Sequence, residues 1–380
     1  FVRETTESGD PVLPLILGQE LTWPSALIVT RRGRGGDRIA IVGRHEDDSV
    51  ARAGAGPGIV ADVEGVSGPL RTVLDRLDPT SIAVNTSTSD VKADGLTHGM
   101  WELLHRYLAG TPFAERLTSA ERVIAAVRGR KTPRELERIR GAIAITDEIY
   151  REVAARVRPG MTELAVSGLM HGLADERGVP TAWDRAQCPI VTTGPDSSVG
   201  HALPSPELTV RPGMVFHLDF GVIAGGYCSD VQRSWYVPSP EAPEPSASIA
   251  DAFDAVRTSI LAARAALRPG VPLWTVDEAA RSTLVARGWP EYAHGTGHQV
   301  GRAAHDGGGL ACPRWERYGD APLMRAEVGQ VFTLELGVEH PDAGYVALEE
   351  MVLVTEDGCD WLTRPQDSLW RLGEPREHVC

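Results

Sequence analysis

The chain has 380 residues, of which 42% are hydrophobic and 24% are charged, the balance of an ordinary globular protein. This length exceeds the usual size of a single hydrophobic core, so we expect two domains. Acidic residues (52) outnumber lysines and arginines (38), and the net charge of −14 argues against a nucleic-acid or anionic-membrane partner.

The five cysteines are widely spaced and form no CxxC pair. They predict free thiols in a reducing compartment and no structural zinc site. No apolar run approaches the roughly 18 residues of a membrane span, and the first residues show no signal-peptide pattern. We therefore expect a cytoplasmic protein, and we expect that a chain beginning at Phe1 rather than methionine has lost residues at its start.

Residues 1–127 predict a small α/β domain. Its expected strands are 25–30, 38–42 and 81–84, and its expected helices are 68–77 and 97–108. Residues 128–380 form the second expected domain. Its first helix begins at Thr132-Pro133-Arg134-Glu135, with Thr132 as N-cap, proline at the first helical position and Glu135 completing a capping box.

The second domain contains an internal duplication. GMVFHLDFGV (213–222) and GQVFTLELGV (329–338) share the pattern G-x-V-F-x-L-acid-x-G-V. Two predicted helices precede each copy: 133–157 and 162–178 before the first, and 248–267 and one capped at Thr275 before the second. The first helix of each pair ends in Arg-Pro-Gly. The pattern favours an α+β fold with pseudo-two-fold symmetry.

Residues 213–237 predict a β-hairpin with its turn at Ala224-Gly225-Gly226. A turn centred between Ala224 and Gly225 places Asp219 opposite Asp230. Like charges so paired are destabilising unless a cation lies between them, so the hairpin indicates a metal ion. The alternative is that Asp230 follows a bulge and caps a turn, while Asp219 is an isolated strand acid.

The second copy repeats this arrangement. Glu335 takes the position of Asp219, and a turn centred on Asp342 places it opposite Glu349. Between the copies lies HGTGHQVGRAAHDGG (294–308). Any one of its three histidines could be a core residue, but the interleaved glycines allow close backbone approach. One imidazole with four carboxylates suits two first-row divalent ions.

The order Asp, eleven residues to Asp, HGxGHxxG, xExG and a C-terminal acidic strand resembles the pita-bread metallopeptidases, which include methionine aminopeptidase, aminopeptidase P and prolidase. The resemblance covers about 130–365, and residues 1–127 are similar to the creatinase/prolidase N-terminal domain. It implies a C-terminal pita-bread fold with a smaller α/β N-terminal domain. The implied metal ligands are Asp219, Asp230, His298, Glu335 and Glu349.

The resemblance also implies a mechanism. A hydroxide bridging two divalent metals attacks the peptide carbonyl, and Glu335 relays the proton. His305 hydrogen-bonds the scissile carbonyl, while His201 and His294 line the substrate pocket. Manganese, zinc and cobalt all tolerate this ligand set. The implied activity is hydrolysis of Xaa-Pro bonds, preferentially in dipeptides, by a homodimer.

The sequence departs from the family pattern at three places. Leu336 replaces the proline of E-P-G, Glu339 stands where a tyrosine is usual, and Ala347 stands where an arginine is usual. A similar loss is a feature of some bacterial prolidases. Arg302 is our candidate replacement cation for substrate binding, with a surface or supporting role as the alternative. Arginines at 31, 34 and 44 of a partner subunit are a less favoured source.

Two further residues carry expectations. Arg233 is expected to hold a carboxylate beside the metal ligands, and His217 is expected to be a hydrogen-bonded core histidine.

Three other functions stay open. The first is Xaa-Pro aminopeptidase activity, and the second is a metal-retaining non-peptidase hydrolase of the creatinase-like group, which the altered Glu339 and Ala347 leave possible. The third is a metal-free binding module, which the filled ligand positions and the net charge of −14 disfavour.

Overall fold

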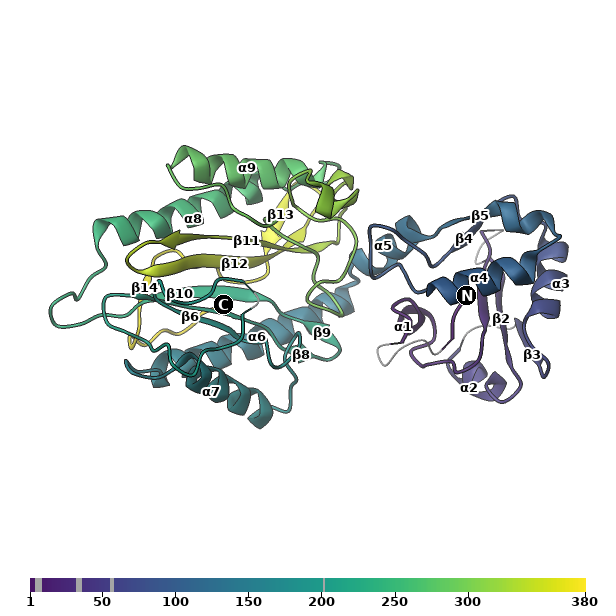
Figure 1. Cartoon of the computed structure of the whole chain (residues 1–380), viewed down its shortest axis with the longest axis horizontal. Coiled ribbons are helices and arrows are strands. Elements are labelled where there is room, and N and C mark those ends of the chain that lie inside the picture. Colours follow the sequence, from purple (N-terminus) through teal and green to yellow (C-terminus); the bar gives the residue numbers. More distant parts are fainter. Residues whose placement is uncertain (4–8, 32–35, 55–57, 201) are drawn as a thin grey trace. The chain divides into compact units, whose positions relative to one another are not determined.

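A computed structural model describes residues 1–3, 9–31, 36–54, 58–200 and 202–380. Two compact units make up the chain, Phe1–Arg128 and Gly129–Cys380 (Figure 1). The division falls one residue after the boundary expected from the sequence, and the kinship of the first unit to a creatinase-type domain stays a prediction. No helix in the described parts of the chain combines the length and apolar character needed to cross a membrane.

The first unit holds a three-stranded sheet of order β1-β2-β3 and a separate parallel pair, β4-β5. The expected strands and helices occur within two residues of their predicted bounds. Its elements are α1 (Leu13–Ile16), β1 (Ala26–Val29), β2 (Arg38–Gly43), α2 (Asp47–Arg52), β3 (Gly58–Asp62), α3 (Ser67–Leu77), β4 (Ile82–Val84), α4 (His98–Leu108), a 3-10 turn (Pro112–Arg116), β5 (Leu117–Ser119) and α5 (Glu121–Gly129).

The second unit is built around a seven-stranded sheet of order β11-β12-β10-β7-β6, with β13 on β12 and β14 on β10. Its strands are β6 (Ile190–Thr193), β7 (Val215–Phe220), β10 (Val231–Tyr236), β11 (Val331–His340), β12 (Gly344–Val354), β13 (Cys359–Trp361) and β14 (Trp370–Arg371), with a small hairpin of β8 (Ile223–Ala224) and β9 (Tyr227–Cys228). Its helices are α6 (Pro133–Arg156), α7 (Glu163–Glu176), α8 (Ala247–Ala266) and α9 (Leu273–Ala286), with 3-10 turns at Glu316–Tyr318 and Ala321–Leu323.

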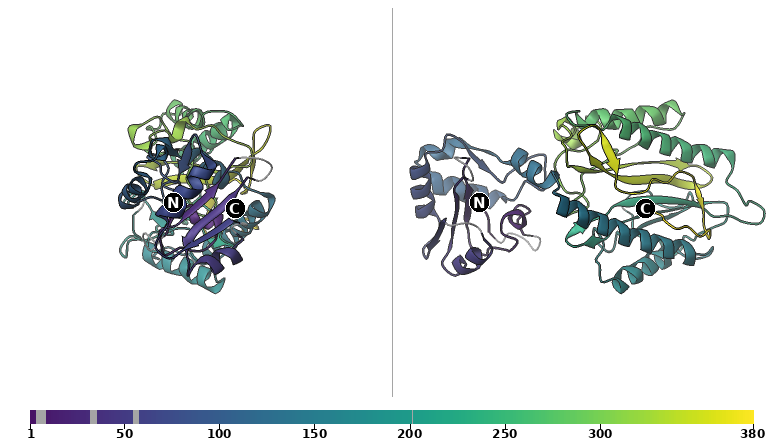
Figure 2. Two further views of the ribbon diagram at one scale, coloured as in Figure 1. Left: turned by 90° about the vertical axis from the view of Figure 1, so that its right-hand side faces the viewer. Right: turned by 180° about the vertical axis from the view of Figure 1, so that it is seen from behind.

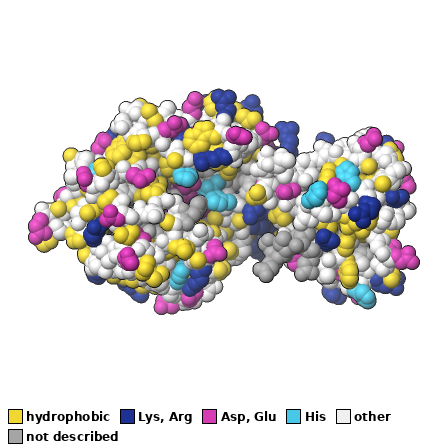
Figure 3. Space-filling model, in the orientation of Figure 1, with side chains coloured by type: hydrophobic (Ala, Val, Ile, Leu, Met, Phe, Trp, Pro, Cys, Tyr) yellow, Lys and Arg dark blue, Asp and Glu magenta, His cyan; other side chains and the backbone are white. Residues whose placement is uncertain are grey.

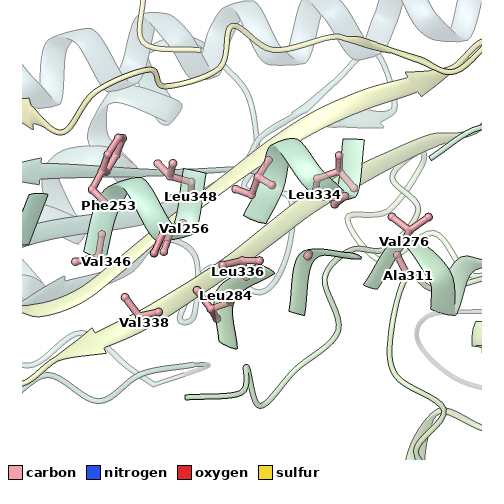
Figure 4. Close-up of a cluster of buried hydrophobic side chains, with 14 of the residues drawn as sticks. Phe253, Val256, Val276, Leu284, Ala311, Leu334, Leu336, Val338, Val346 and Leu348 are labelled. Carbon is pink, nitrogen blue, oxygen red and sulfur yellow. The ribbon is translucent and has the colours of Figure 1, made fainter. Parts of the chain in front are cut away.

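Each helix pair covers its own half of the sheet. Helices α8 and α9 lie along β11 and β12, whereas α6 and α7 lie along β7 and β10 (Figures 1 and 2). Alternate residues of β11 and β12, such as Leu334, Leu336 and Leu348, pack against α8 and α9 (Figure 4). Because side chains alternate along a strand, the intervening residues project from the opposite face. That face carries the predicted ligands.

The duplication extends to individual backbone hydrogen bonds. The Gly160 and Gly270 amides donate to the carbonyls of Val210 and Ala326, each at 2.8 Å. Both glycines have positive φ, 92° and 84°, as expected of residues that follow a helix end. The two Arg-Pro-Gly stops therefore have the same structure.

The hairpin turn lies one residue further along the chain than predicted. Gly225 and Gly226 have φ of 57° and 80°, the signature of a two-residue turn that needs positive φ at both positions. Ala224 therefore pairs with Tyr227, and Asp219 pairs with Gln232. The prediction that Asp219 lies directly opposite Asp230 is wrong. The register changes by an even number of residues, so both acids still lie on one face.

Two helix starts test the capping predictions. Thr132 accepts a hydrogen bond from the Glu135 amide and the full capping box is present, as predicted. The prediction of a cap at Thr275 is wrong, because α9 begins earlier, at Leu273, and the Thr275 hydroxyl donates to the Pro272 carbonyl at 2.6 Å. The Leu273 amide donates to Met324 O at 2.9 Å, so a distant backbone group supplies a partner at this helix start.

Candidate metal centre

One row of polar residues crosses four adjacent strands of the second unit. Glu335 of β11 pairs with Glu349 of β12, Glu349 pairs with Gln232 of β10, and Gln232 pairs with Asp219 of β7. Asp230 lies two residues before Gln232 and therefore on the same face. Both copies of the repeat thus contribute two carboxylates to one side of the sheet. The predicted pairing of Glu335 with Glu349 is confirmed.

His298 reaches this row from the segment that runs beside β11. Its amide donates to Thr333 Oγ1 at 3.1 Å, and its carbonyl accepts from the Thr333 amide at 2.8 Å. A Cβ atom at Gly297 would lie 2.0 Å from the Thr333 carbonyl oxygen. Only glycine permits this approach, as the glycine pattern predicts.

The imidazole of His298 lies among three of the carboxylates. Its Nε2 atom is 3.7 Å from Asp230 Oδ2, 3.5 Å from Glu335 Oε1 and 3.7 Å from Glu349 Oε1. Ligand atoms of Asp230, His298 and Glu349 all lie within 4.8 Å of one another, close enough to hold one metal ion. Asp219 borders the same cluster, since its charge raises the pKa of Asp230.

Asp230 and Glu349 are buried, and Asp219 and Glu335 are half-buried. Asp219 Oδ1 and both carboxylate oxygens of Glu349 are buried and have no hydrogen-bond partner among the described residues. The pKa values of Asp219, Asp230 and Glu349 are raised well above the ordinary range. Burial is the larger cause and repulsion from neighbouring acids is the smaller one. Burial also raises the pKa of Glu335 to about 7. Such groups are costly unless a cation balances them.

His298 has the protonation state of a metal ligand. Burial, with a smaller contribution from His305, lowers its pKa to about 3, so the imidazole is neutral. Its Nδ1 atom lies 3.4 Å from the Gln299 carbonyl, which leaves Nε2 facing the acids. One neutral imidazole and four carboxylates, some with unsatisfied oxygens, form a donor set that fits first-row divalent cations.

The flanking histidines lie at the margin of this cluster. The His305 ring packs edge-on against His298, with 4.3 Å between ring centroids, and the His294 ring packs against Tyr292 at 5.6 Å. Both side chains are exposed, and histidine side chains gather at the surface of this unit in Figure 3. His201, the third predicted pocket histidine, lies outside the described residues.

Arg302 is predicted to bind substrate, but in the structure its side chain contacts Tyr227. Its guanidinium lies over the Tyr227 ring, 5.7 Å from the centroid. The Tyr227 hydroxyl in turn donates to Glu135 of α6 at 2.6 Å. The predicted role of Arg302 in substrate binding stays a prediction.

Two supporting residues behave as expected. Arg233 is fully buried and pairs with Glu350, the neighbour of Glu349, at 2.9 Å. His217 is a buried core histidine that contacts Thr192 Oγ1 at 3.3 Å and Gln232 Oε1 at 3.1 Å. Burial lowers the pKa of His217 to about 4.

Sequence reasoning missed Gln232, which lies at the centre of the row. Its Nε2 donates to Glu335 Oε2 at 2.8 Å, and its Oε1 faces His217. Gln232 therefore joins the two copies of the repeat at the level of the carboxylates. The available signal was its position two residues after Asp230, which places both side chains on one face of the strand.

Comparison with known proteins identifies the family. Residues 137–356 match the description "Metallopeptidase family M24". The chain is 30% identical to a Xaa-Pro dipeptidase of Lactobacillus delbrueckii subsp. lactis over 282 residues, 73% of this chain and 71% of the relative. It is 28% identical to an uncharacterized peptidase, YqhT, of Bacillus subtilis over 278 residues, 73% of this chain and 72% of the relative.

Solved structures agree on the fold. A Xaa-Pro dipeptidase from Bacillus anthracis superposes with a TM-score of 0.74 at 22% identity, covering 97% of this chain and 94% of that one. An X-Pro aminopeptidase from Thermotoga maritima gives a TM-score of 0.72 at 21% identity, covering 97% and 96%. The second unit has the pita-bread fold, and the chain belongs to metallopeptidase family M24.

Proposed function

We propose that this metallopeptidase hydrolyses Xaa-Pro peptide bonds, preferentially in dipeptides, with two divalent metal ions. The convergence of four carboxylates and a neutral imidazole on one side of the sheet carries the proposal. The Xaa-Pro dipeptidases among its relatives, at 27–30% identity, support the choice of substrate. The family implies divalent metals, and manganese, zinc and cobalt are the candidates.

Asp219, Asp230, His298, Glu335 and Glu349 would hold the ions. When bound, the ions supply an acidified water and positive charge for the oxygen that becomes negative during hydrolysis. The four acids would no longer repel one another, because each would have a cationic partner. This arrangement removes the need for a nucleophilic side chain.

Glu335 is the proposed proton carrier. It is the most exposed of the three acids around His298, with 18% of its side chain accessible against 7% for Asp230 and 1% for Glu349. One carboxylate oxygen is occupied by the Gln232 amide, which fixes the orientation of the group. The other oxygen faces His298, where a proton could be taken up and passed on.

The exposed histidines are proposed to contact substrate. His305 lies directly against His298, so it is the group best placed to hydrogen-bond the scissile carbonyl. His294, His201 and Arg302 complete the proposed substrate contacts, with His294 also assigned to the catalytic group. We further propose a cytoplasmic homodimer, supported by the five free cysteines and, for the dimer, by family resemblance alone.

Three peptides test the proposal. Metal-stripped protein is assayed with a Xaa-Pro dipeptide, a Xaa-Pro-Xaa tripeptide and a proline-free dipeptide, before and after manganese or zinc is restored. We expect metal-dependent turnover of the Xaa-Pro dipeptide, with less or none of the other two. Preference for the tripeptide would instead assign an aminopeptidase. Metal-bound protein that cleaves none of the three would contradict peptidase activity.

A further inference from the structure

We call the row formed by Glu335, Glu349, Gln232 and Asp219 the acid row. The neighbouring row of side chains has unusually small residues where it crosses β11 and β12. Gly337 pairs with Ala347, and further across the sheet Ser234 pairs with His217. Beyond this row, Glu339 pairs with Tyr345. Because alternate residues of a strand share a face, Tyr345 lies on the same face as Glu349. The two smallest residues therefore separate Tyr345 from the acid pair Glu335–Glu349.

Tyr345 lies across this small-residue space toward the acids. A Cβ atom built at Gly337 would lie 2.4 Å from both the Cζ and the hydroxyl oxygen of Tyr345. The phenol therefore covers Gly337, which is two residues from Glu335 on the same face. The ring also packs edge-on against His217, 5.2 Å between centroids, which holds it down on the sheet. The absence of a side chain at position 337 is what admits the hydroxyl.

The hydroxyl of Tyr345 can donate a hydrogen bond, and it lies close enough to Glu335 and Asp219 to be affected by their charges. A side-chain hydrogen bond joins the hydroxyls of Tyr345 and Tyr292. A phenol has one hydrogen to donate and lone pairs to accept, so the Tyr345 hydroxyl can donate to a ligand while it accepts from Tyr292. Burial, and then the charges of Glu335 and Asp219, raise the pKa of Tyr345, so the phenol stays protonated. Both tyrosines are half-buried, which leaves them accessible to a small ligand.

We propose that Tyr345 is a substrate-contacting catalytic residue whose hydroxyl donates a hydrogen bond to the peptide oxygen that becomes negative as the bond is cleaved. Tyr345 thus supplies, from strand β12, a hydroxyl that its strand partner Glu339 cannot supply. Tyr292 holds the phenol in place. This inference rests on the proposed peptidase function.

The first test is Tyr345→Phe, which keeps the ring over Gly337 and removes only the hydroxyl. A donor used mainly in the transition state lowers kcat with little change in KM. We expect kcat for the Xaa-Pro dipeptide to fall at least about tenfold and KM to stay within about twofold, with the metal content of wild type. Tyr236→Phe is the matched control, because its hydroxyl donates to the Ala242 carbonyl at 3.0 Å; its kcat should be unchanged.

A second variant displaces the hydroxyl instead of removing it. The methyl group of Gly337→Ala collides with the phenol, so kcat should fall in the wild-type background and change little in the Tyr345→Phe background. Unchanged kcat in Tyr345→Phe, or equal losses from Gly337→Ala in both backgrounds, would overturn the role of Tyr345. An inactive wild type would contradict the peptidase proposal itself, so the two failures are distinguishable.

Discussion

Arg233 shows how single residues hold the site from behind. Its guanidinium is fully buried and donates to the carbonyls of Gln232 and Glu349, at 2.8 and 2.9 Å, and to the carboxylate of Glu350 at 2.9 Å. Two of these partners belong to residues of the acid row. Arg233 therefore ties strands β10 and β12 together on the side opposite the proposed metals.

Removing this guanidinium should be costly. Arg233→Met leaves Glu350 buried without its cationic partner, and we expect the free energy of unfolding to fall by about 3–5 kcal/mol. Chemical denaturation measures the change. Arg211→Met is the matched control: its pair with Asp196 spans 2.8 Å but is exposed, so we expect a loss below about 1 kcal/mol. Equal losses in the two variants would contradict the assigned role.

The acids make metal-free protein sensitive to pH. The pKa of Glu335 is raised from its ordinary 4.5 to about 7 in the folded protein, so its contribution to stability is present below 4.5 and lost as pH rises through about 7. The pKa values of Asp219, Asp230 and Glu349 are raised in the same direction. His217 and His298 have lowered pKa values in the folded protein. They therefore change the pH dependence of stability only below pH 6.5, their ordinary pKa.

Above pH 6.5 the two histidines no longer contribute. Burial lowers the pKa of the Phe1 amino group from 8.0 to about 6, so this one group raises stability up to pH 8, but the several carboxylates outweigh it. Between pH 6.5 and about 8, we expect the unfolding free energy of metal-free protein to fall by on the order of 1 kcal/mol per pH unit. Restored metal should abolish the fall, because ligation keeps the carboxylates ionised without repulsion. Denaturation at several pH values measures both curves. Stability of metal-free protein that rises across this window would refute the assignment.

Among single residues, the five candidate metal ligands could be predicted from the sequence. Their spacing in the motif and their positions along the strands indicate that they converge. The roles of Gln232 and Tyr345 could not be predicted, although the position of Gln232 two residues after Asp230 does place it on the same strand face. Each acts through a neighbour across the sheet, and a single sequence does not state which residues become cross-strand neighbours. The error in the Asp219–Asp230 pairing has the same origin, since a shift of one residue in the turn moves every pair in the ladder.

At the scale of elements, the hairpin turn fixes the register that places Asp219 beside Gln232. Gly226 has φ of 80°, and no atom of the described residues lies within 4 Å of an added Cβ, so a substitution there meets only backbone strain. We expect Gly226→Ala to lower the free energy of unfolding by about 1–2 kcal/mol. Gly226→Asn is the matched control and should cost less, because asparagine tolerates this conformation. Equal losses would contradict a backbone origin.

Long helices and the repeated strands could be predicted well, because amphipathic periodicity extends over many residues. Thr132 and the Arg-Pro-Gly stops marked helix ends correctly. The short elements, such as α2 and β3 in the first unit, carry too few residues for a periodic signal. The start of α9 was misplaced because Met324, distant in sequence, supplies its first hydrogen bond.

For the whole molecule, the internal duplication explains why one site needs both halves of the second unit. Asp219 and Asp230 come from the first copy, and Glu335 and Glu349 from the second. The central strands β10 and β12 pair through Gln232 and Glu349, so the copies meet at the acid row. Neither copy alone holds enough ligands for two ions.

The central claim is that two metal ions in this row drive peptide hydrolysis. The direct measurement titrates manganese into metal-free protein and records, in the same samples, ions bound per chain and turnover of a Xaa-Pro dipeptide. We predict that turnover rises with bound metal and reaches its plateau at two ions per chain. Turnover by metal-free protein, or two bound ions with no turnover, would contradict the account.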